Sequence, residues 1–485
     1  MTLVSCITDR SLRMHWHDAW FGQVSTFPLS VLRVCMGVIL LKTAILNLPI
    51  ASVFYSDAGV LPRAVAHQLA THLGHLTLMD ALPTAESATA FFVLWAVVAL
   101  GVLIGFQTRP LSVLNFVLIL SVHVRNPYLV SGADDMLRLM SFWMIFVPLN
   151  RHLSVDAWLA RRRGRCLPET TNAFPVRLLQ LQVALTYLAA GLFKLLGTSW
   201  RGGTALYEVL QVQSLLRPAG EWFALHAPDG LLRVLTYGVI IFELGFIVLV
   251  FVPFWQPLLR YLGIASLASM HVGIALTMTT PLLDFVFVFC ASYLVFFVTS
   301  RPLSVDPPLS PPARRRQQGM YAVLALLMGL TVWQIAANYA GYGVPSVPIP
   351  APLTNVLKTL GFAQDWSLFA PEPMQYDAYI AVIGTFDDGT SYDLRSGSTD
   401  QSVILPYPTT LTEYRWGGFQ LNVFSHRPSA VLEAWSRYYC RSENPPDRPP
   451  RLRSLQIRII YRRVYAPGQK PNPIQNDLVW LHSCT

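Results

Sequence analysis

Three polar side chains interrupt the apolar stretch 174–197 at intervals of seven residues: Gln180, Tyr187 and Lys194. Seven residues make nearly two turns of an α-helix, so the three side chains share one face. Ala190 and Gly191 lie on that face and leave room beside it. A lysine at membrane depth is costly unless it faces a protein interior or a wet cavity, which favours a functional role. The structural alternative is a lysine near the helix end whose side chain reaches the headgroups.

Lys194, His271 and Tyr187 are the residues that we predict to be catalytic. A lysine in apolar surroundings can serve as a general base, and histidine and tyrosine complete an acid/base set. For His271 the alternative is an ordinary helix–helix hydrogen bond. Glu243 lies near the middle of another apolar stretch, where a carboxylate needs a partner or a proton. No metal-ligand spacing, nucleophile elbow, phosphate loop or dinucleotide fingerprint is present, so no metal is predicted.

Further polar residues fall between the apolar stretches, and we predict that they bind substrate. They are Arg125, Asn126, Asp134, Asp135 and Trp200, together with Glu243. The alternative for the aspartates is structural. An aspartate at a helix start complements the helix dipole, and Asp135 can pair with Arg138 one turn later.

The elements that position these residues are membrane helices. The chain has 485 residues, of which 53% are hydrophobic and 13% charged. That charged fraction is about half of the roughly 25% usual in soluble domains. The mean hydropathy of +0.43 agrees with a polytopic membrane protein. The net charge of +9 does not indicate nucleic acid, because arginines gather in two short loops, as membrane topology requires.

Apolar runs long enough to span a bilayer predict about nine helices, which we place at 28–48, 87–106, 109–124, 133–149, 174–197, 230–254, 258–278, 281–299 and 319–340. The loops 150–173 and 300–318 carry the clustered arginines and are predicted to be cytoplasmic. The N-terminus is then cytoplasmic as well, and residues after 341 are extracytoplasmic. We therefore predict a protein of the cytoplasmic (inner) membrane. Residues 1–27 lack a cleavable signal pattern and suggest an amphipathic helix on the membrane surface.

A change in composition after residue 340 divides the chain into a transmembrane domain (28–340), a proline-rich linker (341–352) and a small α+β domain (353–485). Strand-like runs flank an Asp-Gly turn at Asp388, which predicts a hairpin. Residues 428–439 have helical periodicity, and 452–464 alternate as a strand with one buried face. Outside the cell Cys440 and Cys484 can form a disulfide, although two free thiols are the alternative.

The run Tyr187-Leu-Ala-Ala-Gly191-Leu-Phe-Lys194, followed by Trp200 and Gly203, resembles the helix that carries the catalytic lysine of the vitamin K-dependent gamma-glutamyl carboxylase. Ser269-Met-His271 resembles a histidine-bearing span of that enzyme. The segments Arg125-Asn126-Pro127, Gly132-Ala-Asp134 and Ser154-Val-Asp156 resemble the wider bacterial family of horizontally transferred transmembrane (HTTM) proteins. The chain departs from the carboxylase at Pro127, where that enzyme has a functional histidine.

The resemblance implies an enzyme that acts on reduced vitamin K, another quinone or another lipophilic substrate, with Lys194 as the base and His271 beside it. The alternative is a non-catalytic maturation or assembly factor whose outer domain grips an exported polypeptide. A transporter is a third hypothesis, although no internal repeat supports it. The predicted partners are the lipid bilayer and an exported peptide or protein, and nucleic acid is excluded.

Overall fold

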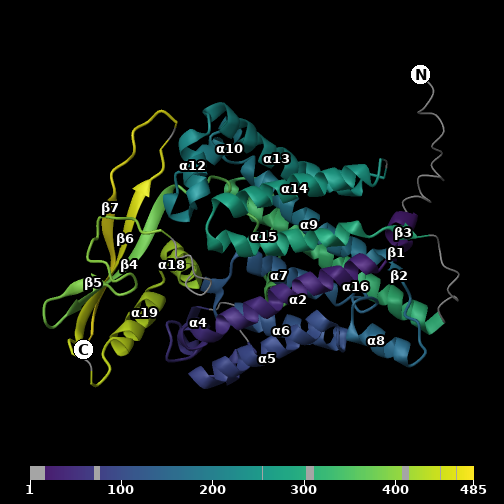
Figure 1. Cartoon of the computed structure of the whole chain (residues 1–485), viewed down its shortest axis with the longest axis horizontal. Helices are drawn as coiled ribbons and strands as arrows, with labels where there is room; N and C mark the ends of the chain where they lie inside the picture. Colours follow the sequence, from purple (N-terminus) through teal and green to yellow (C-terminus); the bar gives the residue numbers. More distant parts are fainter. Residues whose placement is uncertain are drawn as a thin grey trace.

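The computed structural model describes residues 17–69, 77–253, 255–301, 311–406, 414–447, 449–465 and 467–484. Helices form a bundle, and a four-stranded sheet lies at one end of it (Figure 1). Of the predicted N-terminal amphipathic helix, residues 1–16 lie outside the described residues. Residues 17–21 are helical and precede strand β1.

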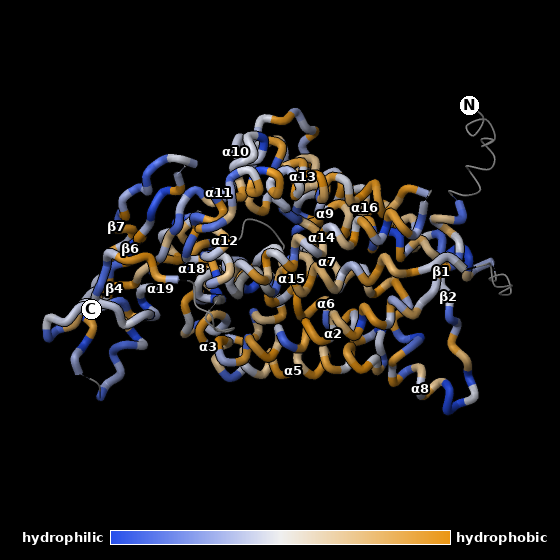
Figure 2. Tube along the Cα trace, turned by 45° about the horizontal axis from the view of Figure 1, so that its top comes forward, coloured by the Kyte–Doolittle hydropathy of each residue, from blue (hydrophilic) through white to orange (hydrophobic). Residues whose placement is uncertain are grey.

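Six helical segments in the described ranges are long and apolar enough to cross a membrane: Phe27–Tyr55, Ala85–Ile104, Ala173–Lys194, Asp229–Phe251, Leu258–Thr277 and Pro311–Tyr342. They contain α2 (Phe27–Asn47), α3 (Ala51–Tyr55), α5 (Ala85–Ile104), α9 (Ala173–Lys194), α13 (Asp229–Phe251), α14 (Leu258–Thr277) and α16 (Pro311–Asn338). Figure 2 shows these helices largely in orange, the colour of hydrophobic residues, and shows more of the blue, hydrophilic residues toward the two ends of the molecule. The prediction of a polytopic helical membrane protein is confirmed.

Three of the nine predicted spans are shorter or more polar than the prediction requires. They correspond to α6 (Thr108–Arg125), α7 (Gly132–Met144) and α15 (Thr280–Ser292). The 13 residues of α7 and of α15 extend only about 20 Å, against a hydrocarbon core of about 30 Å. The 18 residues of α6 include charged and amide side chains that lower its hydropathy. These three helices are therefore shorter or less apolar than the six segments named above.

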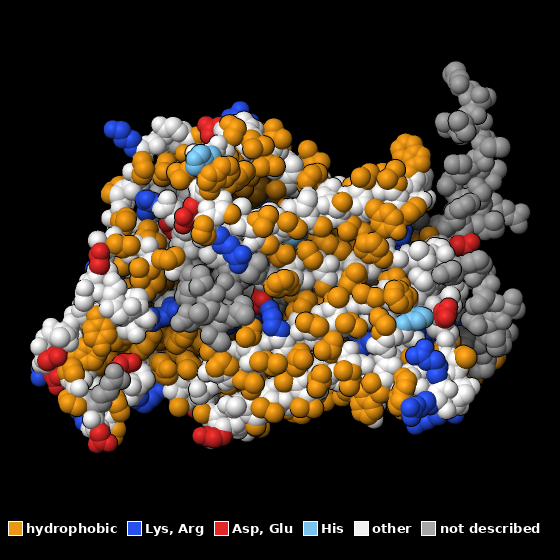
Figure 3. All heavy atoms as spheres, in the orientation of Figure 1, with side chains coloured by type: hydrophobic (Ala, Val, Ile, Leu, Met, Phe, Trp, Pro, Cys, Tyr) orange, Lys and Arg blue, Asp and Glu red, His pale blue; other side chains and the backbone are white. Residues whose placement is uncertain are grey.

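Helix α9 is the centre of the bundle. In its most apolar window 83% of residues are buried, whereas the corresponding share is 28% in α13 and 22% in α14. The polar face predicted from the spacing of Gln180, Tyr187 and Lys194 therefore points into protein. Hydrophobic side chains cover the outside of the bundle between its two ends (Figure 3).

A small antiparallel sheet closes the end of the bundle opposite the four-stranded sheet. Its order is β2 (Thr170–Asn172), β1 (Gln23–Ser25), β3 (Ser300–Arg301). It joins the start of α2, the start of α9 and the segment after α15. The remaining helices of the bundle are α4 (Arg63–Leu69), α8 (Val155–Arg162), α10 (Thr198–Gly202), α11 (Ala205–Val209) and α12 (Pro218–His226).

The four-stranded sheet belongs to the C-terminal part of the chain, which we call the outer domain. Its antiparallel order is β5 (Ser391–Asp393), β4 (Tyr376–Phe386), β6 (Leu452–Arg463), β7 (Gln475–Ser483). The predicted hairpin, helix and strand correspond to β4–β5, α19 (Ser429–Ser442) and β6. Helices α17 (Ala351–Thr359) and α18 (Tyr414–His426) and strand β7 were not predicted. Cys440 and Cys484 form a disulfide that ties the end of α19 to the end of β7.

Candidate functional site

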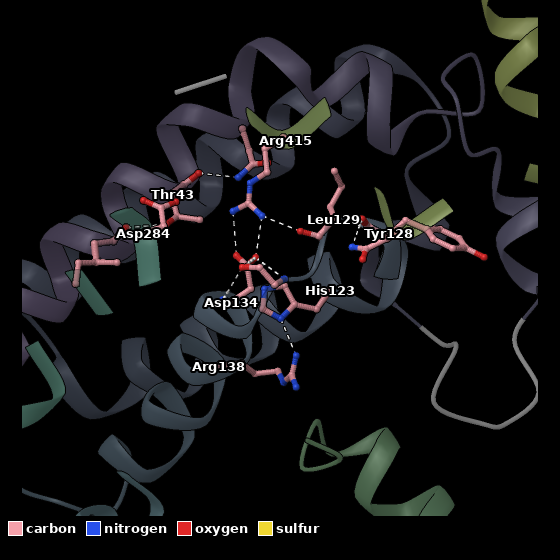
Figure 4. Close-up of polar contacts among 12 residues, drawn as sticks. Thr43, His123, Tyr128, Leu129, Asp134, Arg138, Asp284 and Arg415 are labelled. Carbon is pink, nitrogen blue, oxygen red and sulfur yellow. Dashed lines mark hydrogen bonds and ion pairs between the residues drawn. The ribbon is translucent and has the colours of Figure 1, made fainter. Parts of the chain in front are cut away.

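An ion pair between the bundle and the outer domain is the best-defined polar site at their junction (Figure 4). Arg415 of α18 donates through Nη1 and Nη2 to the two carboxylate oxygens of Asp134, each at 2.9 Å. Its Nη1 also donates to the Leu129 carbonyl at 2.9 Å. Both side chains are buried, Asp134 at 5% exposure and Arg415 at 8%. Ser131 completes the site, because its backbone N–H donates to Asp134 at 2.9 Å in a capping box that starts α7.

Asp135 and Arg138 form a second charge pair on the same helix, at 2.6 Å. Arg138 also donates to the Gly361 carbonyl at 2.9 Å, and its Nη1 lies 2.8 Å from His123 Nδ1 (Figure 4). The arginine thus joins α6 and α7 to the segment after α17. Asp135 thus pairs with Arg138 one turn later on α7, which is the geometry of the structural alternative given above for this aspartate.

Arg125 and Asn126 hold α3 and the segment after it against the end of α6. Arg125 donates to the Leu61 carbonyl at 2.8 Å, and Asn126 donates to the Phe54 carbonyl at 3.0 Å. Both side chains are buried, yet Nε and Nη1 of Arg125 and Oδ1 of Asn126 lack a hydrogen-bond partner among the described residues. Beside them lies a cavity of about 500 Å³, lined in part by Arg125 and Lys358. Of the two residues Arg125 lines this cavity, whereas Asn126 lines a smaller pocket together with Asp134 and Arg415.

Lys194 is paired with Glu243. Its Nζ lies 2.9 Å from both carboxylate oxygens, and Lys194 is 4% exposed. Gly191 permits the close contact of α9 with α13, since a Cβ at this position would lie 2.9 Å from Leu244. The ammonium group also lies 5.1 Å from the centre of the Trp200 ring. This contact joins α9 to α13 and gives each of the two buried polar groups a partner.

Tyr187 and His271 meet through a third residue, Tyr293. The Tyr187 and Tyr293 hydroxyls are hydrogen-bonded, and the Tyr293 hydroxyl lies 3.1 Å from His271 Nδ1. That nitrogen also lies 2.8 Å from the Leu267 carbonyl, whereas Nε2 is buried without a partner among the described residues. The structure therefore brings two of the predicted catalytic residues together, and it gives the third, Lys194, a different partner. Gln180 has other partners: it donates to the Val295 carbonyl at 2.9 Å and accepts from Arg177 at 2.7 Å.

Residues 28–296, more than half of the chain, match the family model described as the lipase maturation factor transmembrane domain. The chain belongs to this family. The matched region begins in α2 and ends just after Tyr293, so it contains every predicted site residue of the bundle, whereas Arg415 and the outer domain lie beyond it. No curated protein and no solved structure match the chain.

The lipase maturation factor domain is bound to its outer domain at further points that the sequence did not reveal. Glu372 accepts hydrogen bonds from the Thr198 hydroxyl at 2.7 Å and the Ser199 backbone N–H at 3.0 Å, at the start of α10. Burial works to raise the pKa of Glu372, but these hydrogen bonds outweigh it and hold the pKa below its usual range. Trp200 donates to the Phe369 carbonyl at 2.8 Å. Trp200, predicted to bind substrate, therefore contacts the outer domain.

Three residues of these sites were missed, and for two of them no local pattern marks the residue. Arg415 lies 281 residues from Asp134, and nothing in the sequence around it distinguishes it from the arginines that the structure leaves exposed. His123 lies one helix away from Arg138, which the sequence alone does not place nearby. Tyr293 carried a signal that could have been used, since a tyrosine within an apolar run needs a partner for its hydroxyl.

Proposed function

We propose that the protein is a non-catalytic maturation factor for an exported lipase, and that its outer domain contacts the exported polypeptide. Membership of the lipase maturation factor family supports this role. The observation that carries the proposal is an exposed apolar surface on a domain that is clamped to the bundle through Arg415 and Asp134. A clamped domain can hold an unfolded segment at a fixed distance from the membrane.

The surface in question, which we call the outer-face patch, consists of Val403, Ile474, Leu478 and Leu481. Their exposed fractions are 44%, 44%, 50% and 59%. In register, Leu478 pairs with Arg458 and Leu481 pairs with Gln456, two residues that share one face of β6. A bulge at this point brings both leucines to the face opposite the core, while Trp480 pairs with the core residue Ile457.

The edge strand β7 gives the patch a second feature suited to an extended polypeptide. Strand β7 is the last strand of the sheet, so its outer backbone groups have no neighbouring strand within the described ranges. The bulge limits long edge-to-edge pairing of the kind that causes aggregation. Exposed leucines and a short free edge together favour transient contact with an unfolded chain over stable strand addition.

The proposed orientation places the outer domain outside the cytoplasm and the arginine-rich loops inside it, in the cytoplasmic membrane. Arginines 161, 162, 163 and 165 lie at the opposite end of the bundle from the four-stranded sheet (Figure 1), which supports this arrangement. We propose that residues 28–340 form the transmembrane domain, residues 341–352 the linker and residues 353–485 the outer domain.

A quinone-dependent or carboxylase-like enzyme with Lys194 as base, as the resemblance to the HTTM family implies, is the less favoured hypothesis. Lys194 Nζ lies 2.9 Å from the Glu243 carboxyl group, so the amine that this hypothesis requires for proton transfer is already engaged within the bundle. Tyr187 and His271 share Tyr293 as a hydrogen-bond partner, whereas Lys194 contacts Glu243, and this difference in partners weighs against a single acid/base set. We therefore assign the Lys194–Glu243 pair to packing of α9 on α13.

The patch is tested by replacing Leu478 and Leu481 together with aspartate in cells that export a lipase. We expect active lipase to fall about tenfold, since loss of an interface anchor costs about 1–2 kcal/mol or more. Membrane levels and thermal stability of the protein should not change, because both side chains are exposed. The matched control is Val347→Asp with Val356→Asp, two exposed apolar residues outside the patch. Unchanged lipase activity in the patch variant, or an equal loss in the control, would contradict the proposed function.

A further inference from the structure

We propose that helix α8 and its flanking residues bind the headgroups of anionic phospholipids in the adjacent membrane leaflet. The binding surface, which we call the α8 basic patch, consists of Leu153, Trp158, Arg161, Arg162, Arg163 and Arg165. It lies at the end of the bundle far from the outer domain, where blue side chains gather over α8 (Figure 3). This inference is independent of the proposed action on a lipase.

The four arginines of the patch are exposed and form no ion pair with any described residue. The carboxylate on the same helix, Asp156, is already engaged. It accepts from the Gln107 backbone N–H at 2.8 Å, from the Thr108 backbone N–H at 3.0 Å and from Asn150 at 3.2 Å. Because Asp156 caps α6, the positive charge of the patch stays available for an external anion.

Two apolar side chains stand beside these arginines. Leu153 is 58% exposed and Trp158 is 46% exposed. The backbone of Leu153 has a φ of 50°, a left-handed conformation that costs a branched residue free energy. Its carbonyl turns inward to accept a hydrogen bond from the buried guanidinium of Arg33. The fold thus holds a leucine outward at a conformational cost.

The combination of charge and apolar surface fits the boundary between headgroups and hydrocarbon. The Arg162 guanidinium carbon lies 3.9 Å from the centre of the Trp158 ring, so one side of the pair is aromatic and the other cationic. Tryptophan is enriched at the membrane interface, and guanidinium groups bind phosphate oxygens in pairs. A zwitterionic headgroup also carries a phosphate, but its ammonium group opposes the arginines. The ligand class is therefore the anionic phospholipid.

The test measures lipid retention by the purified full-length protein in detergent micelles, using native mass spectrometry. The probes are dioleoylphosphatidylglycerol and dioleoylphosphatidylcholine at equal concentration. We expect the wild type to retain phosphatidylglycerol in preference. Substituting Arg161, Arg162, Arg163 and Arg165 with glutamine should reduce that preference at least about fivefold, the factor expected from a single arginine at an anionic surface. Replacement of the same four residues with lysine should keep most of the preference.

The matched control removes the same charge at the other end of the molecule, by substituting the exposed Arg427, Arg437, Arg453 and Arg463 with glutamine. It should retain the wild-type preference. Leu153→Ser with Trp158→Ser, a variant with no change of charge, should lower retention of both lipids. Equal retention of the two lipids by the wild type would overturn the proposal, as would an equal loss of preference in the control. If the four-residue variant does not fold, Arg161→Gln with Arg163→Gln provides the same comparison.

Discussion

Substitution of Arg415 with methionine is expected to lower the free energy of unfolding by about 3–5 kcal/mol, the usual cost of removing one partner from a buried ion pair. The loss leaves the Asp134 carboxylate buried without the two hydrogen bonds at 2.9 Å that it receives from the guanidinium. The outer domain should then become more accessible to protease, because this pair joins α18 to α7. Limited proteolysis and chemical denaturation in detergent micelles measure both effects.

The matched control for this prediction is the double variant Arg415→Met with Asp134→Leu. Replacing both members of a buried pair with apolar residues is often close to neutral. The double variant should therefore recover most of the stability, less about 1 kcal/mol for the cap that Asp134 shares with Ser131 at the start of α7. If the single variant keeps its stability and its protease resistance, the clamp does not hold the outer domain.

Substitution of Lys194 with methionine should destabilise the bundle by a similar amount, about 3–5 kcal/mol, because Glu243 would remain buried without a counter-ion. Thermal unfolding of the purified protein measures this loss. The double variant Lys194→Met with Glu243→Leu should recover most of it, since α9 and α13 then meet through apolar side chains. The production of active lipase should follow stability, with a loss in the single variant and recovery in the double variant.

The Lys194–Glu243 pair distinguishes the catalytic function from the non-catalytic one, because a leucine at position 243 cannot restore a catalytic base that the loss of Lys194 has removed. If Lys194 accepts a proton from a substrate, the double variant folds and stays inactive. If the pair serves packing alone, the double variant folds and matures lipase. A stable but inactive double variant would therefore overturn the structural role that we assign to Lys194.

Spacing within one helix was the most reliable guide to the bundle. The seven-residue interval of Gln180, Tyr187 and Lys194 predicted one polar face, and the central position of α9 turns that face into protein. The need of Glu243 for a partner also followed from its depth, since a carboxylate among apolar helices must be compensated. The partner itself did not follow, because helix neighbours are set by tertiary packing.

Contacts between distant segments account for most of what the sequence could not provide. The pairing of Asp134 with Arg415 joins a helix of the bundle to a helix of the outer domain. The sequence around either residue does not indicate which residue is its partner. Strand β7, at Gln475–Ser483, mixes exposed leucines with polar residues around a bulge, so its alternation is broken and it was not predicted.

Photo-crosslinking from position 481 tests the central claim most directly. A photoreactive amino acid would replace Leu481 in the outer-face patch, and the control would carry it at Arg437, an exposed position on α19. In cells that export a lipase, we predict a crosslinked product with the newly exported lipase from position 481 and none from position 437. A protein that crosslinks equally from both positions, or from neither while lipase maturation proceeds, would contradict the claim that the outer domain contacts the exported polypeptide.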